Sequence, residues 1–260
     1  MQETSIPIRS SLRTKTTSKI ALNNDELLSS ERAVIDAING VLASGRFEVS
    51  EYIDLGCGNG ALTYWISEII QSKKTYGIDY LESNCRDAQE NGISALTLDL
   101  DRQKLPFLDS TFDFASMIEV IEHVSNKDQI LKETHRILKV GGLFLVSTRN
   151  IASIINRMLL LIGQVPWSYD LSAEYWIDKR IFQKEKAFYG HFTTQYNLNS
   201  ICNHLEKIGF SIIEIKGMTG PQFNMFGPLK HTIGKIVMKM PTFAPGFVIL
   251  ARKNSKKLHI

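Results

Sequence analysis

The sequence has few cysteines and no long uninterrupted apolar run. Its three cysteines are widely spaced: Cys57, Cys85 and Cys202. They form neither a CxxC pair nor a disulfide framework, which is typical of a reducing compartment, so we predict a cytoplasmic protein. The most apolar stretch, residues 151–163, is interrupted by Asn156 and Arg157. It is shorter than the roughly 18 residues that a membrane-spanning helix needs, so we predict no such helix.

Acidic residues are absent from one end of the chain. Residues 217–260 contain no Asp or Glu but seven basic residues: Lys230, Lys235, Lys239, Arg252, Lys253, Lys256 and Lys257. The formal net charge of the whole chain is only +3, so the first 216 residues carry −4. This near-neutral balance gives no electrostatic footprint for nucleic acid, and we predict no nucleic-acid partner.

The chain length favours one domain with an insertion over two domains. Residues 1–23 are rich in Ser and Thr, with four basic residues against Glu3. We interpret them as a flexible N-terminal arm; a resemblance to an organellar transit peptide is the weaker alternative. The domain itself is expected over 24–253, followed by a basic tail at 254–260.

Strand and helix patterns alternate along this domain. Strands are predicted at 52–56, 75–79, 95–100, 112–120, 143–148, 211–218 and 247–253. Helices are predicted at 25–45, 61–71, 81–92, 127–140 and 193–210, with Ser125 and Asp128 as a capping box and Gly141-Gly142 as a stop. Such alternation indicates an α/β fold, a Rossmann-like doubly wound sheet with an antiparallel final pair possible. Residues 150–191 break the rhythm and predict an insertion or cap.

The turn after the first strand is the strongest candidate site. Gly56, Gly58 and Gly60 occupy it, and glycines there allow a ligand to approach the backbone at a helix N-terminus. Asp79 ends the second strand, where a carboxylate can accept hydrogen bonds from ribose hydroxyls. Gly56, Gly58 and Ala61 also satisfy the dinucleotide pattern G-x-G-x-x-G/A, so a nicotinamide oxidoreductase is one alternative.

Three further features distinguish the two cofactors. Asp54 precedes the glycines, where an acid can meet a cationic ligand or orient the loop. Asp99 ends the third strand, where it can accept from an adenine amino group. The runs "LPFLDSTFD" and "EVIEHV" then surround the fourth strand. A dinucleotide site leaves these features unexplained, and we favour an amino-acid-containing cofactor.

In this order the segments resemble a class I S-adenosylmethionine-dependent methyltransferase of the broad group that includes the ubiquinone-biosynthesis methyltransferases. The resemblance rests on "DLGCGNG", "GID", "LDLD", "LPFLDSTFD", "EVIEHV", "ETHRILKVGGLFLVST" and "GHFTTQYNLNSICNHLEKIGF". It covers most of the chain from about Leu27 to Lys253. It implies a seven-stranded sheet whose last strand is antiparallel, and S-adenosylmethionine as cofactor. The implied cofactor-binding residues are Asp54, Gly56, Gly58, Gly60, Asp79, Asp99, Leu100 and Ile118.

Two histidines are candidates for proton transfer, because an oxygen acceptor must lose a proton when it is methylated. His123 ends the "EVIEH" run, and His191 lies where the insertion rejoins the domain. Glu119, Glu122 and His123 also resemble the Mg²⁺ site of small-RNA 3′-end and quinone O-methyltransferases, with His191 as a fourth ligand. The same run occurs in relatives not known to use a metal, and we favour the interpretation without one.

Residues 229–240 form a basic amphipathic pattern that allows two interpretations. Its apolar face can cover the protein's own acceptor pocket, which we favour, or lie on an anionic membrane. The sequence thus predicts methyl transfer from S-adenosylmethionine to a small-molecule or lipid-linked acceptor held beneath the 150–191 insertion, with oxygen as the favoured target atom. The alternatives are an RNA-end or metal-assisted O-methyltransferase and a cofactor-binding subunit without turnover.

Overall fold

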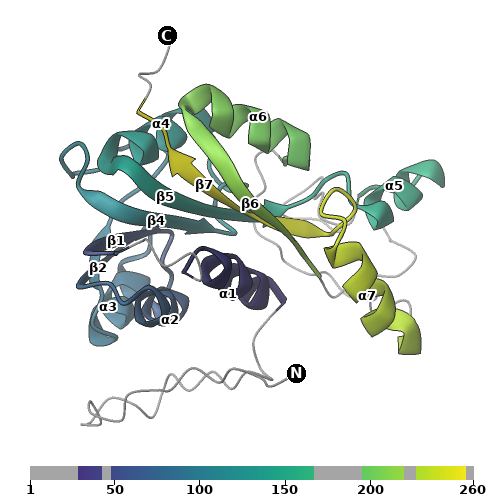
Figure 1. Cartoon of the computed structure of the whole chain (residues 1–260), viewed down its shortest axis with the longest axis horizontal. Helices are drawn as coiled ribbons and strands as arrows, with labels where there is room; N and C mark the ends of the chain where they lie inside the picture. The colour runs from purple at the N-terminus through teal and green to yellow at the C-terminus, as the bar shows by residue number, and fades with distance from the viewer. Residues whose placement is uncertain (1–28, 43–47, 167–194, 220–226, 256–260) are drawn as a thin grey trace.

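The computed structural model describes residues 29–42, 48–166, 195–219 and 227–255 (Figure 1). The helices are α1 (Ser29–Leu42), α2 (Ala61–Ile70), α3 (Glu82–Glu90), α4 (Lys127–Ile137), α5 (Ile154–Leu161), α6 (Leu198–Ile208) and α7 (Lys230–Met238). The strands are β1 (Glu51–Leu55), β2 (Lys74–Asp79), β3 (Ser94–Thr97), β4 (Phe112–Ile118), β5 (Leu138–Arg149), β6 (Phe210–Met218) and β7 (Gly246–Lys253).

The strands form one seven-stranded sheet in the order β3-β2-β1-β4-β5-β7-β6. Neighbouring strands from β3 to β5 are parallel, whereas β7 runs antiparallel to both β5 and β6. The predicted α/β sheet with an antiparallel last strand is therefore confirmed. β1 pairs with β2 on one side and β4 on the other, so the strand order reverses there. Ligands of open α/β sheets bind at such a switch point, beyond the carboxyl ends of the strands.

Helices cover both faces of the sheet (Figure 1). α1 and α2 pack Val34, Ile38 and Ile66 into one core cluster, whereas α4 and α6 pack Leu131 and Leu205 into the other. All five side chains are at most 2% exposed. The two apolar layers fix the strand ends, which carry the candidate site.

The helix predicted over 127–140 differs from the structure in its cap and in its last residue. α4 is capped by Asn126, whose side chain accepts from the Gln129 N–H at 3.2 Å, so the predicted Ser125–Asp128 capping box is wrong. The helix stops at Ile137, and residues 138–149 form β5. Gly142 lies inside that strand, where an added Cβ would stand 2.8 Å from the Lys139 carbonyl oxygen. The glycine pair therefore serves the strand rather than the helix stop.

The insertion leaves and re-enters the domain at one point. Asn150 and Tyr196 form an isolated parallel bridge, and the Ile151 N–H donates to the Tyr196 carbonyl at 3.1 Å. The predicted helix over 193–210 consequently begins only at Leu198, after its Asn197 cap. Within the insertion the structure describes α5; residues 167–194 lie outside the described residues.

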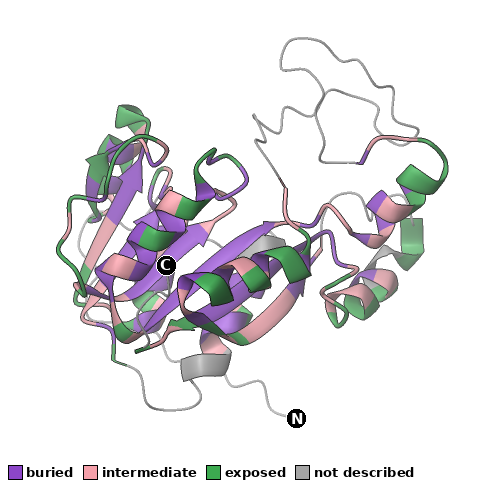
Figure 2. Ribbon diagram, turned by 90° about the horizontal axis from the view of Figure 1, so that it is seen from above, coloured by how far each residue is buried: buried purple, intermediate pink, exposed green. Residues whose placement is uncertain are grey.

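α5 and α7 lie together beyond the end of the sheet (Figure 1). Figure 2 shows that buried residues concentrate along the strands, whereas this helix pair carries much exposed and intermediate surface. Among the described residues, no helix is long and apolar enough to cross a bilayer.

Candidate cofactor-binding site

The turn between β1 and α2 folds over the end of β2. The N–H groups of Gly56 and Cys57 both donate to the Ile78 carbonyl, at 2.7 and 2.9 Å. Gly56, Gly58 and Gly60 all have positive φ values of 90°, 53° and 79°. Residues with a side chain rarely adopt a backbone conformation with positive φ, which explains why glycine occupies these positions of the turn.

The three glycines have different surroundings. A Cβ at Gly56 would collide with the side chain of Val120, and one at Gly60 would lie 2.9 Å from Cα of Ala88 in α3. A Cβ at Gly58 would meet no atom within 4 Å. Gly56 and Gly60 therefore allow close packing of the turn, whereas Gly58 lies beside open space where a ligand can approach the backbone.

Asp79 lies next to Gly58 at the carboxyl end of β2. Its Oδ2 accepts from the Gly58 N–H at 3.0 Å, and its Oδ1 accepts from the Leu81 N–H at 2.9 Å and from Asn84 Nδ2 at 3.0 Å. A carboxylate oxygen has two lone pairs, so Oδ2 keeps capacity for one more donor. This arrangement fits a ribose hydroxyl beside the glycine turn.

Asp54 is buried beneath the turn and connects three elements. It accepts hydrogen bonds from Thr63 Oγ1 of α2 and Ser116 Oγ of β4, both at 2.5 Å, and Ser116 Oγ lies 2.7 Å from the Tyr52 hydroxyl. Burial raises the pKa of Asp54 to about 6, against the lowering effect of the two hydrogen bonds. The structure thus shows an orienting role for Asp54, and its contact with a ligand stays a prediction.

The adenine-side residues lie at the end of β3. Asp99 is partly exposed, and its Oδ1 accepts from the Asp101 N–H at 2.9 Å while Oδ2 lies 3.4 Å from Arg102 Nε. Leu100 is 9% exposed and belongs to a core cluster, whereas Ile118 is partly buried at the end of β4. Asp99 is thus accessible to a ligand, while most of Leu100 is committed to packing.

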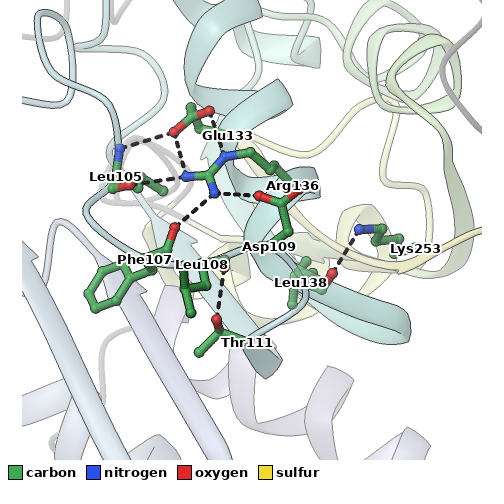
Figure 3. Close-up of polar contacts among 9 residues, drawn as sticks. All are labelled: Leu105, Phe107, Leu108, Asp109, Thr111, Glu133, Arg136, Leu138 and Lys253. Atoms are coloured by element: carbon green, nitrogen blue, oxygen red, sulfur yellow. Dashed lines mark hydrogen bonds and ion pairs between the residues drawn. The ribbon is translucent and has the colours of Figure 1, made fainter.

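Arg136 of α4 fastens the loop that follows (Figure 3). Its Nη1 donates to the Phe107 carbonyl and Asp109 Oδ1, each at 2.8 Å, and its Nη2 donates to the Leu105 carbonyl at 3.0 Å. Glu133 Oε2 accepts from the Leu105 N–H at 3.0 Å. The "LPFLDSTFD" run, which we used to distinguish two cofactors, is therefore held in place by a helix that follows it in the sequence.

The "EVIEH" turn carries the half-buried Glu119 and the buried Glu122 at the end of β4. Glu119 has a φ of 54°, a strained value for a residue with a side chain, and its N–H donates to Ser147 Oγ at 3.1 Å. Its Oε2 lies 3.6 Å from Arg149 Nε, whereas the buried Oε1 has no hydrogen-bond partner among the described residues. Glu122 Oε2 accepts from Thr148 Oγ1 at 2.9 Å. Burial, and then the charge of Glu122, raise the pKa of Glu119 to about 7.

The predicted metal ligands do not converge. Across the described part of the chain, no group of three or more His, Cys, Asp and Glu residues is placed to hold a metal ion. Glu119 is directed to Arg149 and Glu122 to Thr148, while His123 is exposed. The geometry of Glu119, Glu122 and His123 thus does not support the Mg²⁺ prediction. His191, the other candidate base and fourth ligand, lies outside the described residues.

Sequence reasoning missed the partners of these acids. Thr63 and Ser116 hold Asp54, and Asp101 Oδ1 accepts from the N–H groups of Ser125 and Asn126 at 2.6 and 3.0 Å. Asp101 thereby joins the end of β3 to the start of α4. Its place beside Asp99 in "LDLD" was visible, but the residues that it contacts are about 24 positions away.

Comparison with known proteins finds a family match in the middle of the chain. The family described as a methyltransferase domain matches residues 53–146, which contain the glycine turn, Asp79, Asp99 and the "EVIEH" turn. The matched segment covers less than half of the 260 residues of the chain. The open space beside Gly58 together with the spare acceptor capacity of Asp79 fits S-adenosylmethionine as a ligand.

The curated relatives of this chain are distant. The ubiquinone biosynthesis O-methyltransferase of Rickettsia canadensis is 28% identical over 174 residues, which cover 65% of this chain and 65% of the relative. The sterol 4-C-methyltransferase strm-1 of Caenorhabditis elegans is 34% identical over 110 residues, covering 39% of this chain and 32% of the relative. The matches thus span less than two thirds of the relatives' length.

A solved structure agrees over more of the chain. Magnesium protoporphyrin IX methyltransferase of Synechocystis, with bound S-adenosylhomocysteine, superposes with a TM-score of 0.55 at 16% identity. The superposition covers 87% of this chain and 84% of that one. At this identity the likeness shows the shared fold.

Proposed function

We propose that this chain transfers the methyl group of S-adenosylmethionine to an oxygen atom of a small-molecule or lipid-linked acceptor. The observation that carries the proposal is the pairing of Gly58 with Asp79 at the switch point of the sheet. The Gly58 N–H bonds to Asp79 at 3.0 Å, and open space lies beside the glycine. Backbone and carboxylate are thus available together for one ligand.

We assign the cofactor contacts by position along the strand ends. Gly56, Gly58 and Gly60, with Asp54 beneath them, would surround the methionine portion. Asp79 would accept from the ribose hydroxyls. On the far side of β2, Asp99 and Leu100 would flank adenine, and Ile118 would pack beside the cofactor.

The chemistry requires alignment and removal of a proton. The sulfonium of the bound cofactor supplies an activated methyl group, so the protein mainly orients the acceptor for in-line displacement. A hydroxyl acceptor must also give up its proton, for which we propose His123 or His191 as base. His123 lies exposed in the turn after Glu122, where an acceptor can reach it.

The class of acceptor is supported by the relatives. Two of them are named for ubiquinone biosynthesis and for a sterol, and both names denote apolar molecules. A lipid-linked acceptor also suits the apolar, acid-free surface of α5 and α7. Neither observation selects the target atom, and the preference for oxygen rests on the two histidines.

Calorimetry with S-adenosylmethionine and with NAD tests the cofactor site. We expect binding of the former only, and Asp79→Asn should weaken it by about 10- to 100-fold because a charged acceptor is lost. Asp87→Asn is the control, since Asp87 is exposed on α3. Binding of NAD but not of S-adenosylmethionine would overturn the proposal.

Transfer of labelled methyl groups into a cell extract tests the acceptor. We expect the label in the lipid or small-molecule fraction, with transfer reduced in His123→Ala or His191→Ala while cofactor affinity is kept. Label in RNA would favour an RNA-end methyltransferase. Binding without transfer in any fraction would indicate a non-catalytic subunit, and loss of transfer on chelation would restore the metal-assisted alternative.

A further inference from the structure

The helices α5 and α7 form a small unit attached to the end of the sheet. Ile155 and Leu159 of α5 are at most 3% exposed and pack with Ile233 and Val237 of α7. The Ile154 N–H donates to the Phe243 carbonyl at 2.9 Å, which ties the start of α5 to the segment after α7. These apolar residues are therefore buried in the contact between α5 and α7 and are not available to a partner.

Other apolar side chains of this unit face outward. The exposed set, here called the α5–α7 surface, comprises Met158 (51%), Leu160 (57%), Leu161 (86%), Ile162 (59%), Leu229 (62%), Ile236 (57%) and Met240 (48%). Seven exposed large apolar residues thus lie on α5, on α7 or on the residues next to these two helices. Single exposed apolar residues are ordinary, but contiguous patches mark interaction sites.

Helical spacing groups these side chains. Met158, Leu161 and Ile162 are spaced i, i+3 and i+4 along α5, so they share one side of it. Ile236 and Met240 are likewise four residues apart, adjacent to the packed Ile233 and Val237. The amphipathic segment 229–240 therefore uses only part of its apolar face for internal packing.

The described residues of this helix pair and its flanks carry charge of one sign. Residues 150–166 and 227–245 contain no Asp or Glu. Lys235 of α7 and Lys239, the C-cap residue of that helix, are both exposed, and no ion pair joins either to a described acidic residue. Arg157 of α5 lies over the Phe243 ring at 4.8 Å. Exposed apolar side chains bordered by lysines are typical of helices that lie in the interface of anionic membranes.

We propose that the α5–α7 surface docks on an anionic phospholipid bilayer, with its apolar side chains in the interface and Lys235 and Lys239 among the headgroups. Charge complementarity selects this occupant. A second copy of the chain would bring the same basic, acid-free surface and would repel it, whereas anionic headgroups attract it. The proposal needs no helix that spans the bilayer.

The position of the surface gives the docking a purpose. Asn150, at the end of β5, donates through Nδ2 to the carbonyl groups of Thr242 and Ala244, each at 2.9 Å. α5 and α7 are thereby attached at the end of the sheet where β4 and β5 finish. A bilayer held there would lie on the side from which a lipid-linked acceptor approaches. Docking itself requires neither cofactor nor acceptor, so it can be tested apart from the proposed methyl transfer.

Co-flotation of the full chain with vesicles tests the proposal. We expect binding to phosphatidylcholine vesicles that contain phosphatidylglycerol and little binding to pure phosphatidylcholine, with the difference reduced by salt. Reversing two charges in Lys235→Glu/Lys239→Glu should weaken binding by at least about 25-fold. Leu161→Ser/Ile162→Ser should weaken it by at least about tenfold because buried apolar area is lost.

Matched variants elsewhere on the protein distinguish binding through the α5–α7 surface from an effect of net charge or of exposed apolar side chains in general. Lys132→Glu/Lys207→Glu makes the same charge change on α4 and α6, and Leu108→Ser/Val140→Ser removes apolar groups that are 83% and 61% exposed elsewhere. Both should bind like the wild type, and circular dichroism should show all variants folded. Equal loss in the control variants, or no preference for anionic vesicles, overturns the proposal. So does self-association that the α5–α7 substitutions abolish in a chain that binds no vesicles.

Discussion

Arg136 and Glu133 are joined by two parallel hydrogen bonds of 2.9 Å, from Nε to Oε1 and from Nη2 to Oε2. The pair orients the guanidinium, which donates hydrogen bonds to the Leu105 and Phe107 carbonyl groups (Figure 3). It raises the pKa of Arg136 and lowers that of Glu133, chiefly through the hydrogen bonds that they share. The side chains of Arg136 and Glu133 thus act together on the loop between β3 and β4.

Replacing the Arg136 side chain should destabilise the protein. Arg136→Ala leaves Glu133 Oε1 and two carbonyl groups without the donors that Arg136 supplies, and we expect the free energy of unfolding to fall by about 2–4 kcal/mol. Urea denaturation measures it. Arg86→Ala is the control, because its ion pair with Glu82 is exposed at 3.8 Å and should change stability by less than about 0.5 kcal/mol. Equal effects of the two substitutions would contradict the role given to Arg136.

The glycine turn allows binding and folding to be separated. Gly60→Ala places a Cβ against Ala88 and should lower the free energy of unfolding by about 1–3 kcal/mol. Gly58→Ala meets no protein atom and pays only for its left-handed backbone, about 1 kcal/mol. We expect Gly58→Ala to weaken S-adenosylmethionine binding by more than its stability loss, as measured by calorimetry beside thermal unfolding. If Gly58→Ala bound the cofactor normally, the open space beside it would not be the binding site.

Asp54 should make stability depend on pH. Its pKa is raised to about 6, so the folded state holds the proton more tightly than the unfolded state. The stabilisation is present below about pH 4 and is lost as pH rises through about 6, by about 3 kcal/mol in total. Asp54→Asn does not titrate. The stability of the wild type relative to this variant should therefore fall between about pH 4 and pH 7 in urea denaturation. Parallel curves would show that Asp54 ionises normally.

Asn150 should be among the most sensitive polar residues. It is 1% exposed, donates to two carbonyl groups, and accepts from the Ala152 N–H at 3.0 Å. Asn150→Ala should lower the free energy of unfolding by about 2–4 kcal/mol, and Asn150→Asp by more, because its carboxylate would face two carbonyl oxygens. Asn197→Ala, which removes an exposed helix cap, should lower it by about 1 kcal/mol. An Asp variant as stable as the Ala variant would contradict this geometry.

The order of the elements and the glycine turn could be predicted because their signals are local. Alternating apolar runs locate the strands, and Gly56 to Gly60 with Asp79 lie at strand ends whatever the details of packing. The ends of α4 could not be predicted. Asn126 rather than the neighbouring Ser125 caps the helix, and the residues from Leu138 onward belong to β5.

Long-range partners were beyond the sequence. Nothing local indicates that Arg136 holds residues 27–31 positions earlier, or that Asp54 meets Ser116. Glu119 was visible as an acid, but its left-handed backbone and the direction of its carboxylate depend on β5. The metal hypothesis for Glu119, Glu122 and His123 depended on their place in one turn and on a resemblance, neither of which fixes where side chains point, and we favoured the interpretation without a metal.

The bridge between Asn150 and Tyr196 makes the intervening segment topologically self-contained. Its two ends meet just beyond the carboxyl end of β5, so its length can change without altering the register of any strand. We propose that residues 151–195 lie on the acceptor side, so exchanging them should change acceptor preference and leave the cofactor-binding strand ends unchanged. Transplanting residues 151–195 between relatives would then move acceptor choice with the piece that is moved.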